Sequence, residues 1–191
     1  TPTTYIYTLT QHDALPIYAI RYTTAQVINN SVNRSFNYIT LNKGRIHGIK
    51  PDQGIISAKG IVGVVGQVSD SYAMGLSVLN RRWSISAKLK NSGYYGSLMW
   101  PGTDYRIVKL SEIPLHVEIS PGDTVVTSGY SSVFPEGILV GTINDFTRPD
   151  GENYYSIEVQ LSVDFKSLSH VQLVEIVDRD EIIELEDNRE K

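Results

Sequence analysis

The stretch that decides the fold reads Gly122-Asp123-Thr124-Val125-Val126-Thr127-Ser128-Gly129 and resumes at Phe134-Pro135-Glu136-Gly137-Ile138-Leu139-Val140-Gly141. Its glycine turn leads into β-branched residues at 124–126, which suit the half-buried surface of a sheet. A serine–glycine pair ends that run, and a proline–glycine turn leads into a second apolar run at 138–140. We interpret the stretch as a β-hairpin with a long connection, in which the turn residues are structural rather than catalytic.

Similar runs extend from this hairpin in both directions. Residues 61–68 form an apolar run that contains two glycines, which is typical of a buried strand with bulges or tight corners. Residues 83–89 and 156–163 alternate apolar and polar side chains, the period of a strand with one solvated face. Fifteen glycines and eight prolines separate such runs at short intervals. We therefore expect an all-β chain with little helix, built as a barrel or a sandwich.

Two parts of the sequence echo one another. Residues 49–65 and 119–143 each contain a proline turn, a strand, a glycine-bearing loop and a second strand. Two related lobes would produce this echo, and so would chance similarity between hairpins rich in glycine and valine. We expect a first β lobe over residues 19–110 and a second over residues 111–177, and the pattern also allows the lobes to exchange strands.

The two ends of the chain differ from its body. Residues 1–18 have no clean period, and we interpret them as an irregular and candidate non-native segment. Residues 178–191 form an acidic tail with seven acids and three bases, so the tail alone carries the chain's net charge of −4. The body is electrically balanced, and nucleic-acid binding is not expected because it needs clustered basic residues.

Composition also bounds the chemistry and the setting of the chain. It has no cysteine, which excludes disulfides and thiolate nucleophiles. It has no apolar run of about 18 residues or more, the length that a membrane span needs. The sequence begins at Thr1 rather than at a methionine. We expect a piece of a longer protein, with any membrane anchor upstream.

The sequence offers no convincing catalytic, metal or cofactor site. Ser128 lies in a Thr-Ser-Gly turn without the elbow motif of a hydrolase, and His116 lies in an apparent linker. The four histidines are far apart and form no paired motif for a metal. The glycine-rich run at 60–66 is not followed by the Lys-Ser/Thr pair of a phosphate-binding loop. We expect no catalytic residue, no bound metal and no cofactor.

A group of aromatic residues lies on glycine-rich turns. It comprises Tyr94, Tyr95 and Trp100, and Phe134 lies in a separate loop. Aromatic residues on such loops serve as protein contacts or as platforms on which sugars stack. They also plug the ends of barrels, and the sequence leaves these roles open.

Together these residues resemble the MreC family of rod shape-determining proteins. The likeness runs from about residue 25 to residue 177; its most specific part is the stretch at 122–141, supported by residues 39–50 and 60–68. The signature positions are Gly122, Asp123, Thr127, Ser128, Gly129, Pro135, Gly137 and Gly141. The chain departs from the pattern at Asn42, where the family usually has aspartate, which puts one turn contact in doubt.

The resemblance implies a fold and a role. The fold is two small β-barrel lobes reminiscent of chymotrypsin-like barrels but without catalysis. The role is that of a non-catalytic scaffold of the elongation machinery, which positions and activates peptidoglycan synthesis and maintains rod shape. The implied partners are the elongation-specific penicillin-binding protein, MreD, the MreB cytoskeleton and further copies of the protein. The implied location is extracytoplasmic, on an anchor in the inner membrane.

Two other functions remain as alternatives to a scaffold. A cell-wall glycan-binding module would use Tyr94, Tyr95 and Trp100 to stack on sugars. A trypsin-like hydrolase would need Ser128 within hydrogen-bond reach of a histidine.

Overall fold

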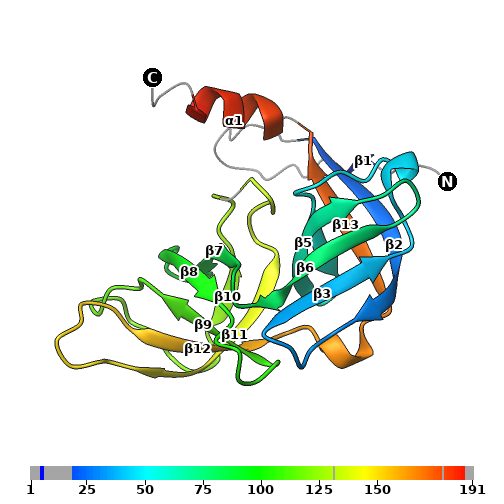
Figure 1. Ribbon diagram of the computed structural model, residues 1–191. Coiled ribbons are helices and arrows are strands. Elements are labelled where there is room, and N and C mark those ends of the chain that lie inside the picture. Colours follow the sequence, from blue (N-terminus) through cyan, green and yellow to red (C-terminus); the bar gives the residue numbers. More distant parts are fainter. Residues whose placement is uncertain (1–4, 7–18, 131, 178, 188–191) are drawn as a thin grey trace.

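The computed structural model describes residues 5–6, 19–130, 132–177 and 179–187, and within them it shows two small β-barrels (Figure 1). The strands are β1 (Tyr5–Ile6), β2 (Ile20–Asn30), β3 (Phe36–Leu41), β4 (Gly54–Ser57), β5 (Gly60–Val68), β6 (Ala73–Asn80), β7 (Ser84–Leu89), β8 (Tyr95–Met99), β9 (Ile107–Ser111), β10 (Thr124–Thr127), β11 (Leu139–Thr147), β12 (Ser156–Leu161) and β13 (His170–Ile176). The helical pieces are η1 (Arg45–His47), η2 (Phe165–Ser167) and α1 (Arg179–Asp187). The predicted all-β chain with two barrels and little helix is confirmed.

The first barrel contains β2 to β6 and β13. The order of its sheet is β1-β2-β13-β4-β5-β6-β3, and a further pairing of β2 with β3 closes it. Closure depends on the length of β2, because residues 20–26 pair with β13 and the end of the strand from Val27 pairs with β3. The short β1 pairs with the start of β2 outside this ring. Apart from β1, the candidate non-native segment at 1–18 lies outside the described residues.

The second barrel is closed in the order β10-β11-β12-β9-β8-β7. The sequence placed residues 84–110 in the first lobe, whereas the pairing puts β7, β8 and β9 here. The reason is long-range pairing, since β7 lies against β10 and β9 against β12. The chain therefore passes from one barrel to the other through residues 81–83, and it returns to the first barrel as β13.

Alternating side chains build these strands as their period predicts. On β7, Ile85, Ala87 and Leu89 are buried, and the polar residues between them are not. Strand β12 repeats the pattern with Ile157, Val159 and Leu161. Burial of these apolar faces inside each barrel is the main stabilising contribution to the fold.

The barrel walls also need glycine where two strands approach closely. A Cβ on Gly141 would lie 1.9 Å from the carbonyl oxygen of Gln160 on the neighbouring strand. Any other residue would therefore push β11 away from β12. This position explains one glycine of the deciding stretch by packing alone.

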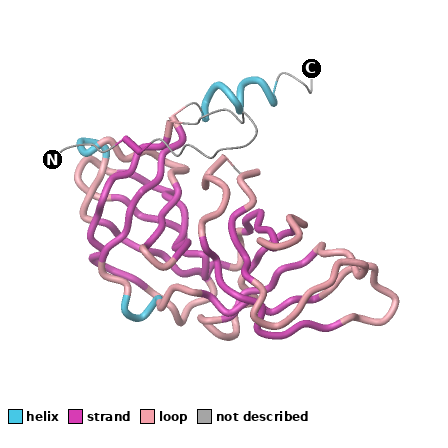
Figure 2. The backbone as a smooth tube through the Cα atoms, turned by 180° about the vertical axis from the view of Figure 1, so that it is seen from behind, coloured by secondary structure: helices cyan, strands magenta, loops and turns pink. Residues whose placement is uncertain are grey.

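The helical pieces are short. Asp164 caps η2, and its carboxylate accepts a 3.0 Å hydrogen bond from the backbone N–H of Lys166. The acidic tail contributes α1, which begins soon after β13 and lies outside both bundles of strands (Figure 2). Within the described part of the chain, no helix is long and apolar enough to cross a membrane.

Candidate functional site on the signature loop

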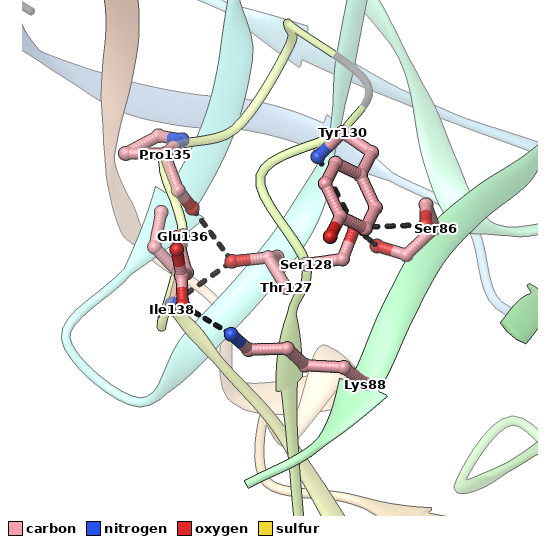
Figure 3. Close-up of polar contacts among 8 residues, drawn as sticks. All are labelled: Ser86, Lys88, Thr127, Ser128, Tyr130, Pro135, Glu136 and Ile138. Atoms are coloured by element: carbon pink, nitrogen blue, oxygen red, sulfur yellow. Dashed lines mark hydrogen bonds and ion pairs between the residues drawn. The ribbon is translucent and has the colours of Figure 1, made fainter. Parts of the chain in front are cut away.

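The loop between β10 and β11, residues 128–138, is named here the signature loop, and it is fixed at its base by Thr127 (Figure 3). The Thr127 hydroxyl donates to the carbonyl of Pro135 at 2.7 Å and accepts from the backbone N–H of Ile138 at 2.9 Å. The Thr127 main chain is also bonded to Ile138 and to Gly137 on the returning limb. One buried side chain thus closes the neck of the whole loop.

Ser128 joins the same loop to the neighbouring strand β7. Its hydroxyl lies 2.7 Å from the Ser86 hydroxyl and accepts from the backbone N–H of Tyr130 at 3.2 Å (Figure 3). The Ser128 side chain is buried. Among the described residues, none of its hydrogen-bond partners is a histidine. The hydroxyl therefore holds the loop against β7.

The other signature residues shape the turns around this neck. The carboxylate of Asp123 accepts a 2.8 Å hydrogen bond from the backbone N–H of Ser120, which fixes the turn into β10. The three turn glycines have positive φ angles of 92°, 86° and 89° at Gly122, Gly129 and Gly137. Asp123 and these three glycines therefore shape the turns on either side of β10 and the turn into β11.

Two of the predicted partner contacts are core residues instead. Phe134 is 1% exposed and Trp100 is 3% exposed. Phe134 packs against Gly54 of the first barrel and lies 6.3 Å from the ring of Trp83, so it plugs the junction between the barrels. Trp100 donates from its indole N–H to the carbonyl of Asp104 at 2.8 Å. Both bury a large apolar area inside the molecule, which removes them from an exposed contact face.

Tyr130 of the signature loop and Tyr95 of strand β8 form an exposed aromatic pair, named here the tyrosine pair. The two rings lie 4.8 Å apart in an edge-to-face arrangement, and they are 56% and 72% exposed. Beside them, Lys88 forms an ion pair with Glu136 (Figure 3). Strand β8 places Tyr95 opposite Lys88, and the bond from Tyr130 to Ser128 fixes where the loop emerges. The pair is therefore an exposed aromatic surface beside a pair of opposite charges.

The remaining predicted contact, Tyr94, lies elsewhere. Its hydroxyl is 3.1 Å from the Nε2 atom of His116, and its ring packs edge-on against the histidine. Tyr94 remains partly exposed. Tyr130 was not among the predicted contacts, although it directly follows Gly129 and therefore lies inside the predicted connection between the two strands.

A small pocket opens next to the signature loop, between the loop and the first barrel. It is lined in part by Lys50, Asp52, Ser132, Val133, Glu175 and Arg179. Its charges are paired: Glu175 accepts from Lys50 at 2.8 Å, and Arg179 lies 3.5 Å from Asp52. The pairing leaves this pocket with little net charge.

The described residues contain no group of three or more His, Cys, Asp or Glu side chains that could hold a metal ion. The side chains that the site presents are exposed aromatic rings and a pair of opposite charges, which are the groups of a contact surface.

Comparison with known proteins places this arrangement in a family. The model for the rod shape-determining protein MreC, barrel core, matches residues 27–175. The cell shape-determining protein MreC of Listeria monocytogenes is 27% identical over 156 residues, which are 78% of this chain. The chain spans about half, 52%, of the length of that relative.

Solved structures share the fold. MreC from Pseudomonas aeruginosa matches with a TM-score of 0.74 at 22% identity, over 80% of this chain and 97% of that one. The complex between penicillin-binding protein PBP2 and MreC from Helicobacter pylori matches with a TM-score of 0.66 at 21% identity, over 83% and 99% of the two chains. At these identities the likeness concerns the fold.

Proposed function

Because this chain belongs to the family of the rod shape-determining protein MreC, we propose that it is a non-catalytic scaffold of the cell-elongation machinery. In this role it binds the elongation-specific penicillin-binding protein and positions and activates peptidoglycan synthesis, which maintains rod shape. The observation that carries the proposal is the family match over residues 27–175, which covers both barrels and the signature loop.

A relative supports the choice of partner. The MreC protein of Helicobacter pylori forms a complex with penicillin-binding protein PBP2, and its fold is similar to that of this chain. We extend that partner class to this chain. MreD, the MreB cytoskeleton and further copies of the protein complete the proposed assembly. The chain spans about half of its Listeria relative, and we place a membrane anchor outside it and the barrels on the extracytoplasmic side.

The tyrosine pair is the proposed contact face for the penicillin-binding protein. Exposed tyrosines are enriched among the residues that dominate binding energy at interfaces. Tyr130 is held by Ser128, and its loop is closed by Thr127. Main chain that is already held by hydrogen bonds loses less conformational freedom on binding. Lys88 and Glu136 would add charge complementarity at the edge of the face.

The contacts of Ser128 support a role without catalysis. Activation of a serine nucleophile requires a base within hydrogen-bond reach. The Ser128 hydroxyl is instead engaged with Ser86 and with the main chain of Tyr130. Replacement of Ser128 by alanine should therefore affect the loop rather than abolish a turnover.

Complementation in cells that lack the native protein tests the proposal. The native gene is depleted, and the full-length protein is supplied either intact or with Tyr95→Ala and Tyr130→Ala together. We expect the intact protein to restore rods and the double variant to leave rounded cells at equal protein level. The matched control is Tyr38→Ala with Tyr72→Ala, two exposed tyrosines of the first barrel, which should restore rods. Rounded cells with the intact protein would refute the proposed function.

Glycan binding is a second candidate function, favoured by the exposure of Tyr94 and Tyr95. The burial of Trp100 removes the tryptophan from that platform. Titration with soluble wall fragments, followed through the NMR signals of the tyrosine rings, distinguishes the two functions. Saturable shifts at Tyr94 and Tyr95 would favour the glycan, and unchanged signals would rule it out.

A further inference from the structure

Three arginines gather where the chain passes from the first barrel to the second. Arg34 lies in the loop between β2 and β3, and Arg81 and Arg82 lie in the linker between β6 and β7. Strands β3 and β6 are neighbours in the first barrel (Figure 1), and Phe36 pairs with Asn80 at this end of the ladder. The Arg81 N–H continues the ladder to the carbonyl of Ser35. The two arginine-bearing segments therefore lie against each other.

Two buried asparagines fix the main chain of these segments. The Asn37 side-chain amide donates to the carbonyl of Arg34 at 2.7 Å, and its oxygen accepts from the N–H of Arg34 at 3.1 Å. The Asn80 side chain accepts from the N–H of Arg82 at 3.1 Å. Asn80 also donates to the carbonyl of Asn37, which connects the two asparagines. Burial of polar side chains is costly unless they are hydrogen-bonded, and here their bonds fix the main chain of the two arginine-bearing segments.

The side chains of Arg81 and Arg82 rest on neighbouring segments. The Arg82 guanidinium carbon lies over the Phe36 ring, 4.3 Å from its centroid. The Arg81 side chain passes over Gly102 in the turn after β8. All three arginines are exposed, and none of them forms an ion pair with a described carboxylate.

The acid of the adjacent turn does not neutralise this cluster. Asp104 is bonded to Arg106 through both carboxylate oxygens, at 3.0 Å and 2.7 Å. These hydrogen bonds to Arg106 hold the pKa of Asp104 at about 2. Both oxygens of Asp104 are therefore engaged by Arg106 rather than by the three arginines.

We propose that Arg34, Arg81 and Arg82 form a binding site for a phosphate group. A phosphate offers several oxygens at tetrahedral angles, so it can accept bonds from more than one guanidinium fork at once. The chain as a whole has a net charge of −4, so the attraction is local to this cluster. The site lies on the barrel linker and does not involve the tyrosine pair; it goes beyond the proposed scaffold function and does not depend on it.

Two phosphate sources share this chemistry: the headgroup of an anionic lipid and a soluble wall polymer with phosphodiester links. The test uses both, as vesicles of phosphatidylcholine with or without phosphatidylglycerol, and as soluble poly(glycerol phosphate). Side-chain NMR signals of the arginines are followed during titration of the whole chain, with citrate as a carboxylate anion of high charge. We expect saturable shifts at Arg34, Arg81 and Arg82 with at least one phosphate ligand and none with citrate.

The variant is Arg34→Gln with Arg81→Gln and Arg82→Gln, and it should bind phosphate about tenfold more weakly or worse, because three charge-assisted contacts are lost. The matched control, Lys59→Gln with Lys90→Gln and Lys109→Gln, removes the same charge from other exposed positions and should keep the affinity. A second variant with lysine at the three arginine positions keeps the charge without the planar forks and should bind with intermediate affinity, provided that its urea unfolding matches the intact protein.

Equal binding of citrate, equal loss in the lysine control or no shift with either phosphate source would overturn the proposal. Shifts of these arginines caused only by self-association at high concentration would also overturn it, in favour of the acidic tail of a second copy.

Discussion

The hydroxyl of Ser162 donates a 2.6 Å hydrogen bond to the backbone carbonyl of Lys59, and this bond fastens one barrel to the other. Ser162 directly follows β12 of the second barrel, and Lys59 lies in the β4–β5 turn of the first. Phe134 fills the junction on the side of the signature loop, next to Gly54. The relative position of the barrels is therefore built into side-chain and main-chain contacts on two sides.

A methyl group at Gly60 should separate the barrels. A Cβ at this position would lie 2.3 Å from the carbonyl oxygen of Leu139 on the second barrel. The control is Gly151→Ala, which also has a positive φ but meets open space. Both variants carry backbone strain, at φ angles of 143° for Gly60 and 79° for Gly151. Only Gly60→Ala adds a clash, so it should lower the free energy of unfolding in urea by about 1–3 kcal/mol more than the control. Equal losses would show that the junction is loose.

Loss of the Thr127 hydroxyl should loosen the signature loop. Thr127→Val keeps the shape but leaves the Pro135 carbonyl and the Ile138 N–H without this partner. We expect a loss of about 1–3 kcal/mol in unfolding free energy, since buried polar groups would be left unpaired. Thr127→Ser keeps the hydroxyl and should lose less. Faster hydrogen exchange at Ile138 in the valine variant alone would locate the effect, and an unchanged valine variant would contradict it.

Truncation of Phe134 should open the junction between the barrels. The ring is buried against the first barrel and lies 6.3 Å from Trp83. Phe134→Ala should cost about 3–5 kcal/mol of stability, the usual range for a large core side chain. Water should then reach Trp83 and shift its fluorescence to longer wavelength. Tyr154→Ala, at an exposed site, should leave the emission unchanged, and the same emission in both variants would mean that Phe134 is not the plug.

Acid should break the pair of Asp104 and Arg106 only at low pH. The hydrogen bonds from Arg106 lower the pKa of Asp104 to about 2, below its usual value of about 3.9. The contribution of the pair to stability is therefore complete above about pH 4 and disappears as the pH falls through about 2. A ¹³C NMR titration of the Asp104 carboxyl should give a midpoint near 2, and Arg106→Gln should raise it. A midpoint near 3.9 in the intact protein would contradict this reading.

Much of the fold could be predicted from the sequence because strands and turns are encoded by residues that are close together in the chain. The alternation at 83–89 predicted the buried face of β7, and the deciding stretch predicted β10, β11 and the turns around them. Each of these inferences depends on residues that are close together in the chain.

The division into barrels and the exposed face could not be predicted in this way. Strand β9 pairs with β12 across an intervening hairpin, and the residues around Ile107 do not indicate which strand is its partner. The aromatic residues show the same limit: Phe134 and Trp100 are buried, whereas Tyr95 and Tyr130 meet in space on the surface. Whether an aromatic side chain is exposed depends on what the other barrel and the loop cover, and the sequence alone does not show this.

The affinity of the chain for the soluble ectodomain of its own elongation-specific penicillin-binding protein tests the central claim most directly. Isothermal titration calorimetry would compare the intact chain, the Tyr95→Ala/Tyr130→Ala variant and the Tyr38→Ala/Tyr72→Ala control, after each is shown to be folded. The account predicts saturable binding by the intact chain and the control, and affinity weaker by about tenfold or more in the variant, as expected when aromatic anchors of an interface are truncated. Equal affinity in all three proteins, or no binding by the intact chain, would contradict it.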